Sequence, residues 1–160
     1  MDISYQGAVI YVRDMPASRH FYEGLLEQVV LMDHGPNIGF QGGFALWQVD
    51  HACEITYGRA PASKGQLGAE NFELYFESVD IEAIWSRLEE AGVRPVHAMR
   101  AQPWGQRVFR VYDPDGHIVE IGEPMPIVIR RFLNEGLSCE EVAQRTSMPV
   151  EIVREIEKAE

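Results

Sequence analysis

The sequence is short of basic residues, of cysteines and of long apolar runs. It holds 14 Lys and Arg against 25 Asp and Glu, a formal net charge of −11. Such a charge repels phosphate backbones and anionic lipid surfaces, so neither nucleic acid nor a membrane is an expected partner. No stretch approaches the roughly 18 apolar residues of a membrane-spanning helix, and no basic segment followed by an apolar run opens the chain. A neutral or cationic small molecule is the expected ligand.

The two cysteines, Cys53 and Cys139, lie far apart in the sequence and in no CxxC pair. Neither a disulfide framework nor a thiolate zinc site is therefore expected, and a reducing cytoplasm is the expected location. What the chain does have is apolar content, at 46% of 160 residues. That is enough for one core and a tail, and too little for two domains of ordinary size.

Strand and helix patterns occur twice in the same order. The first set is a strand at 7–13, a helix from Asp14 to about Leu26, and strands within 29–33 and 40–57. After a linker-like segment at 59–71, the second set is a strand at 72–79, a helix opened by Asp80, and strands at 93–99, 107–112 and 117–122. One uniform shift pairs Asp14 with Asp80 and Glu54 with Glu120.

This order predicts an α+β fold of two βαβββ modules. Module 1 spans about residues 3–58 and module 2 about 72–123, within a domain at 1–124. A single α+β domain without a repeat is the alternative. Residues 125–160 are expected to form a helical extension, in which Ser138 and Glu141 have the spacing of a capping box. The extension resembles a short helix-turn-helix, but its last helix is acidic, so it is expected to support packing or a homodimer.

Several motifs of the second half resemble one known superfamily. They are Phe72-Glu-Leu-Tyr-Phe-Glu-Ser-Val-Asp80, Pro103-Trp-Gly-Gln-Arg107 and Tyr112-Asp-Pro-Asp-Gly-His-Ile-Val-Glu120. Together with Val12-Arg-Asp14 and Phe21-Tyr22 they resemble the glyoxalase/bleomycin-resistance/dioxygenase (vicinal oxygen chelate) superfamily, over about residues 3–123. The Asp113-Pro-Asp-Gly116 stretch is also explained as a hairpin turn, with His117 as a turn residue.

The resemblance implies that the two βαβββ modules form a cupped sheet, with metal ligands that project into the cup from the first and last strand of each module. The matching positions are Gly7, Glu54, Glu73 and Glu120, whereas the family more often has His or Gln on the first strands. Glu54, Glu73 and Glu120 are thus the predicted ligands of a divalent ion such as Mg²⁺, Mn²⁺, Ni²⁺ or Zn²⁺, and an all-oxygen set favours the harder ions. Glu73 and Glu120 are also the candidate catalytic residues, as general bases.

Alternation along 72–78 supports a cup lined by these side chains. Phe72, Leu74 and Phe76 share one face, and Glu73, Tyr75 and Glu77 share the other. Carboxylates that converge there need a cation, a basic ligand group or protons to offset their repulsion. The alternative is that Glu73 and Glu77 are solvated while Glu54 and Glu120 pair with arginines such as Arg107 or Arg110.

Three functions follow from these patterns. The first is a glyoxalase-like, metal-dependent lyase or isomerase that acts on a small molecule. The second is a metal-free, bleomycin-resistance-like protein that sequesters a basic or aromatic compound. Its ligand pocket would be lined by aromatic and acidic side chains: Tyr11, Tyr75, Glu77 and Trp104. The third is an adaptor that works through the C-terminal helices.

Overall fold

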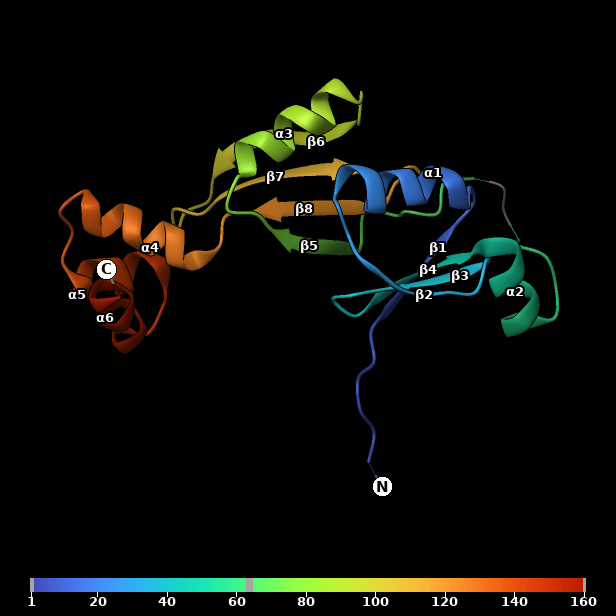
Figure 1. Cartoon of the computed structure of the whole chain (residues 1–160), viewed down its shortest axis with the longest axis horizontal. Coiled ribbons are helices and arrows are strands. Elements are labelled where there is room, and N and C mark those ends of the chain that lie inside the picture. Colours follow the sequence, from blue (N-terminus) through green and yellow to red (C-terminus); the bar gives the residue numbers. More distant parts are fainter. Residues whose placement is uncertain (1, 63–64, 160) are drawn as a thin grey trace. The chain divides into compact units, whose positions relative to one another are not determined.

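The computed structural model describes residues 2–62 and 65–159, so residues 63 and 64 of the predicted linker lie outside the described residues. The chain forms two compact units (Figure 1). Unit 1 comprises the described residues up to Phe72 together with Tyr112–Ile118, and unit 2 comprises Glu73–Val111 and the residues from Val119 onward.

Unit 1 contains a four-stranded mixed sheet in the order β1-β4-β3-β2. Strand β1 pairs with β4 in parallel, while β4 with β3 and β3 with β2 pair antiparallel. The strands are β1 Ala8–Val12, β2 Val30–Asp33, β3 Asn37–Phe40 and β4 Phe44–Gln48. Alternate residues of β1, β3 and β4 are buried, which leaves one face of the sheet open.

The buried face of this sheet packs against a helix. Helix α1, Met15–Arg19, continues as the π-helical segment η1, His20–Leu25, and the Asp14 side chain caps its first turn. The ring of Tyr22 lies 5.5 Å from that of Phe44 and 6.3 Å from that of Phe40. These contacts are part of the core of unit 1. The observed helix agrees with the one predicted from Asp14 to about Leu26.

The segment after β4 is helical, and the predicted strand up to Tyr57 is wrong. Helix α2 spans Val49–Tyr57 and ends at Gly58, whose left-handed conformation stops it. Ala52 and Cys53 are both buried although they are neighbours, which suits one face of a helix and not the alternating faces of a strand. The uniform shift that pairs Glu54 with Glu120 therefore does not hold at this position.

Unit 2 contains a second four-stranded sheet, in the order β5-β8-β7-β6. Helix α3, Ile81–Glu90, is labelled in Figure 1 and is capped by Asp80. Its Trp85 ring makes an edge contact with the Phe109 ring of the sheet, with ring centres 5.0 Å apart. On β5 Leu74 and Phe76 are half-buried, as the alternation predicts. The alternate residues Glu73, Tyr75 and Glu77 are exposed. The strands are β5 Glu73–Glu77, β6 Pro95–Ala101, β7 Arg107–Tyr112 and β8 Ile118–Gly122.

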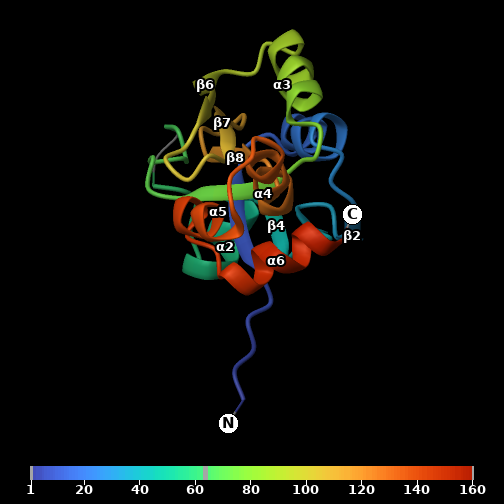
Figure 2. The ribbon, with the colours of Figure 1, turned by 90° about the vertical axis from the view of Figure 1, so that its left-hand side faces the viewer.

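Three further helices follow β8 in unit 2, and both ribbon views show them clustered together (Figures 1 and 2). They are α4 Met125–Asn134, α5 Cys139–Thr146 and α6 Val150–Lys158. They share a core that includes Val128, Phe132, Val142 and Val153. The predicted capping box of Ser138 and Glu141 is present at the start of α5.

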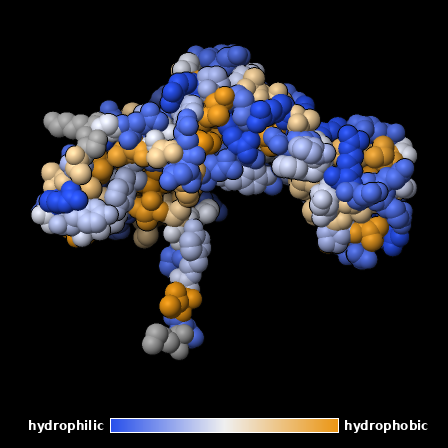
Figure 3. Space-filling view, turned by 180° about the vertical axis from the view of Figure 1, so that it is seen from behind, coloured by the Kyte–Doolittle hydropathy of each residue, from blue (hydrophilic) through white to orange (hydrophobic). Residues whose placement is uncertain are grey.

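The predicted α+β fold with two βαβββ modules and C-terminal helices is confirmed. Among the helices that the structure describes, none combines the length and apolar character needed to cross a membrane. Orange hydrophobic side chains are exposed among blue hydrophilic ones on the face shown in Figure 3. Unit 1 contributes exposed Val9, Leu31 and Met32, which lie next to a cavity described below.

Candidate functional site

The open face of the sheet in unit 2 carries two glutamates bound to one arginine. Arg110 on β7 donates from Nε to the Glu73 carboxylate at 2.9 Å. Its Nη2 forms an ion pair with Glu120 on the neighbouring strand β8. The Glu120 side chain is only 8% exposed and that of Glu73 is 42% exposed. A buried carboxylate is thereby paired with a cation, as its burial requires.

A histidine completes this cluster. His97 Nε2 on β6 lies 3.2 Å from Arg110 Nη1. The order β5-β8-β7-β6 brings the four side chains together, because each comes from a different strand of the sheet. From the sequence, Arg110 is predicted only as an alternative partner of Glu54 or Glu120, and His97 has no predicted role. Pairing across strands depends on sheet order, which the local pattern does not contain.

The residues present do not fit the predicted metal. Arg110 already binds the carboxylates of Glu73 and Glu120. Glu54 lies in unit 1, on the exposed side of helix α2 and not on a strand. Within residues 2–62 and 65–159, no group of three or more His, Cys, Asp or Glu side chains is placed to hold a metal ion.

Gly7, the fourth position of the implied ligand set, lies just before β1 with a φ of 147°. A Cβ built there would come within 2.3 Å of the Gly43 carbonyl oxygen. Glycine is therefore required by the close approach of two backbone segments. The absence of a ligand side chain at this position follows from packing.

Three of the four predicted pocket residues lie in one hydrogen-bonded chain of unit 2. The Trp104 indole donates to Gln106 Oε1 at 3.0 Å, and Gln106 Nε2 donates to the Tyr75 hydroxyl at 2.8 Å. The Tyr75 hydroxyl donates to Glu77 Oε1 at 2.8 Å. Gln106 is buried and also donates to the Glu123 carbonyl oxygen. It therefore fixes the position of this series of hydrogen bonds. Gln106 was not predicted as a site residue. The only feature of the sequence that could have indicated it is its position directly after Trp104-Gly105.

Burial, followed by the hydrogen bond to Glu77, raises the pKa of Tyr75 to about 12. The phenol therefore stays protonated at neutral pH and keeps donating to Glu77. Tyr75 is still 48% exposed, and Trp104 is also partly exposed. The arrangement thus presents two aromatic rings and a carboxylate to solvent.

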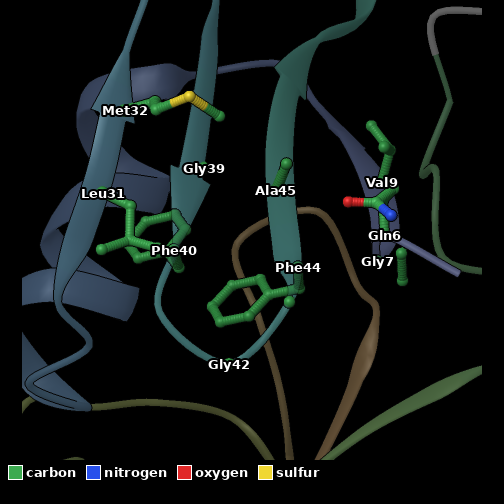
Figure 4. A pocket seen from close by; sticks show the side chains of 12 residues that line it. Gln6, Gly7, Val9, Leu31, Met32, Gly39, Phe40, Gly42, Phe44 and Ala45 are labelled. Atoms are coloured by element: carbon green, nitrogen blue, oxygen red, sulfur yellow. The ribbon is translucent and has the colours of Figure 1, made fainter. Parts of the chain in front are cut away.

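The open face of the sheet in unit 1 is hollowed by a mostly apolar cavity of about 280 Å³. Figure 4 shows its side chains reaching in from the sheet and from the residues before β1. Gly39 adds no side chain on β3, which leaves space between Met32 and Ala45. The other lining residues that Figure 4 labels are Gln6, Gly7, Val9, Leu31, Phe40, Gly42 and Phe44.

Tyr11, the fourth predicted pocket residue, belongs to unit 1 and not to the unit that holds Tyr75, Glu77 and Trp104. Its ring makes an edge contact with Trp47, with the ring centres 6.2 Å apart. It also lines a second cavity of about 310 Å³, together with Phe72 and His117. Tyr11 is thus assigned to unit 1, and the other three predicted pocket residues to unit 2.

Comparisons with known proteins identify relatives of the whole two-module region. The family model described as "Glyoxalase-like domain" matches residues 5–126. The crystal structure of a protein of unknown function from Agrobacterium tumefaciens str. C58 is 35% identical, covers 78% of this chain and 96% of that one, and has a TM-score of 0.71. That of a glyoxalase-related enzyme from Fulvimarina pelagi is 26% identical, covers 75% and 88%, and has a TM-score of 0.61.

A curated relative matches a shorter stretch. An uncharacterised protein of Mycobacterium bovis (strain ATCC BAA-935 / AF2122/97) is 29% identical over 83 residues, which are 52% of this chain and 54% of that protein. The chain thus spans about half the length of this relative.

Proposed function

The chain belongs to the glyoxalase-like domain family, and on that premise we propose that it binds a small cationic aromatic compound on the open sheet face of unit 2 without a metal ion. The resemblance to the glyoxalase/bleomycin-resistance/dioxygenase superfamily is confirmed. Within that superfamily, the proposal favours the metal-free binding role over metal-dependent lyase or isomerase chemistry.

The observation that carries the proposal is the binding of Arg110 to both Glu73 and Glu120. A guanidinium at these carboxylates offsets the repulsion that a metal ion would otherwise offset. A divalent ion at the same oxygens would have to displace Arg110 and then lie beside its positive charge. The metal-dependent lyase or isomerase stays a prediction, and Arg110 opposes it.

The proposed ligand class follows from Glu77 and its neighbours. Within the described residues, no cationic side chain forms an ion pair with Glu77, whose Oε1 accepts the Tyr75 hydroxyl. A ligand cation can therefore bind this carboxylate, while the rings of Tyr75 and Trp104 provide flat surfaces for an aromatic group. The net charge of −11 favours the approach of cations.

The experiment compares three ligands that share one ring system and differ in charge. Tryptamine is cationic, indole is neutral and indole-3-acetate is anionic, and isothermal titration calorimetry measures the affinity of each. We expect the order tryptamine, indole, indole-3-acetate. The substitution Glu77→Gln should lower the tryptamine-to-indole preference by about threefold, the range of an exposed ion pair.

Glu90→Gln is the matched control, because it removes the same charge from the exposed end of α3. It should leave the preference for tryptamine unchanged, and Trp104→Ala should weaken all three ligands. Equal affinities for tryptamine and indole-3-acetate, or equal effects of the Glu77 and Glu90 substitutions, would contradict the proposal.

A further inference from the structure

A buried carboxylate in unit 1 holds the ring of a histidine. The Asp113 side chain has no solvent exposure, and its Oδ1 accepts the backbone N–H groups of Asp115 at 2.9 Å and His117 at 2.8 Å. Its Oδ2 accepts the Tyr22 hydroxyl at 3.0 Å and lies 3.0 Å from His117 Nδ1. The carboxylate is thus bound by donors at both oxygens, which fixes its position.

This contact sets the tautomer of His117. An ionised carboxylate only accepts hydrogen bonds, so His117 Nδ1 carries the hydrogen in this pair. The lone pair of the neutral imidazole is then on Nε2. Within the described residues, Nε2 makes no hydrogen bond. In the neutral form of the ring, Nε2 is a hydrogen-bond acceptor of fixed orientation, on a side chain that is only 11% exposed.

His117 lines the cavity of about 310 Å³ in unit 1. The other walls are apolar or aromatic and come from strand β1 and from the segment that precedes β5: Ala8, Val9, Ile10, Tyr11, Leu67 and Phe72. A cavity of this size with mainly apolar walls suits a small aromatic molecule. His117 adds a ring with polar nitrogens to these walls.

From this geometry we infer a binding site for a phenol, whose ring contacts Tyr11 and Phe72 and whose hydroxyl donates a hydrogen bond to His117 Nε2. A neutral hydroxyl suits the site better than a carboxylate, because Asp113 and Asp115 both lie in the turn that carries His117. The site uses none of the residues that bind the ligand in the proposed function, so each is tested separately.

The test compares phenol with anisole, which has the same ring but a methyl ether in place of the donating hydroxyl. Imidazole ¹⁵N NMR of the wild-type protein reports on Nε2 directly. Phenol should move the His117 Nε2 resonance and leave the His34 resonances unchanged, whereas anisole should not move Nε2. A His117 Nε2 signal that responds equally to the two compounds, or to neither, would overturn the inference.

Substitution of the histidine gives a second readout. His117→Phe keeps a flat ring without the acceptor, and His117→Gln keeps an amide that can donate to Asp113. In either variant the ratio of phenol affinity to anisole affinity should fall about fivefold, the effect of one hydrogen bond. His34→Phe, at an exposed position of the same unit, is the control and should leave the ratio unchanged. A ratio unchanged in a folded His117 variant would show that the histidine only closes its turn.

Discussion

At the scale of single residues, Arg110 matters because it binds one carboxylate that is buried and one that is partly exposed. Removal of one partner of a buried ion pair leaves the other partner charged and desolvated, which is more costly than the pair itself. Removing one partner of a solvent-exposed ion pair costs little stability, because the remaining charge stays hydrated.

Arg110→Met should therefore destabilise the protein by about 3 kcal/mol, because Glu120 stays buried without its cation. Urea denaturation measures this loss. Adding Glu120→Gln to the same variant should restore about half of it, since the uncompensated charge is then gone. Arg100→Met, at an exposed position of β6, is the control and should change stability by less than about 0.5 kcal/mol. A double variant that is no more stable than Arg110→Met would contradict the pairing.

Residue patterns predicted part of this cluster. The alternation of Glu73, Tyr75 and Glu77 along β5 identified the side chains of the open face, because a strand places every second residue on one side. Arg110 was harder to select, since Arg107 on the same strand is also a plausible partner for a glutamate. Arg107 binds Glu123 and Glu82 of helix α3 instead, because two arginines three positions apart on β7 lie on opposite faces of the sheet.

At the scale of elements, a buried glutamate ties helix α4 to the sheet of unit 2. Glu123 follows β8 and accepts hydrogen bonds from Arg107 Nε on β7 at 2.8 Å and from Arg131 Nη1 on α4 at 2.8 Å. Burial alone would raise the pKa of Glu123, but the hydrogen bonds from the two arginines outweigh it and lower this pKa below the ordinary 4.5.

The lowered pKa has a definite pH dependence. An acid whose pKa is depressed in the folded state contributes stability above its unfolded-state pKa and loses that contribution as the pH falls through the folded-state value. Glu123→Gln should cost about 3 kcal/mol near neutral pH, and the difference from wild type should shrink as the pH falls below about 4. Urea denaturation at a series of pH values measures both, and a difference that grows on acidification would contradict this assignment.

The capping box gives a smaller effect at the same scale. Ser138 Oγ accepts the Glu141 backbone N–H at 3.3 Å, and Glu141 Oε2 accepts the Ser138 backbone N–H at 2.8 Å. Ser138→Ala should destabilise helix α5 by about 1 kcal/mol. In Ser138→Ala, amide hydrogen exchange should become faster in α5 than in the wild-type protein and stay unchanged in the sheet. Ser138→Asp should retain most of the protection of α5, because aspartate also caps helices. Unchanged exchange in Ser138→Ala would show that packing alone holds the helix.

Element types were predicted best where a cap or an alternation marks them. Asp14, Asp80 and Ser138 all cap the helices that they were predicted to begin. Helix α2 was missed because Val49–Tyr57 contains β-branched residues and no capping side chain, so its sequence also suits a strand. The burial of both Ala52 and Cys53 agrees with the helix and not with a strand. The predicted ligand role of Glu54 assumed that this residue lies on a strand.

At the scale of the whole molecule, the repeated order of elements predicted the fold although the two halves share few identical residues. Such an order survives substitution because it depends on apolar pattern, caps and turns. The use of the sheet faces could not be predicted in the same way. It depends on which side chains meet across strands, and a single arginine changes the chemistry of the expected metal ligands. The homodimer stays a prediction.

We propose that Arg110 provides the positive charge at Glu73 and Glu120 that a metal ion would otherwise provide. Ligand binding would then need no metal. This is tested by calorimetric titration of the EDTA-treated 160-residue chain with Mg²⁺, Mn²⁺, Ni²⁺ and Zn²⁺, with thermal unfolding followed in parallel. We expect no saturable binding and no rise in Tm for any of these ions. Binding of one equivalent by the wild-type protein that is lost in Glu120→Gln would contradict it.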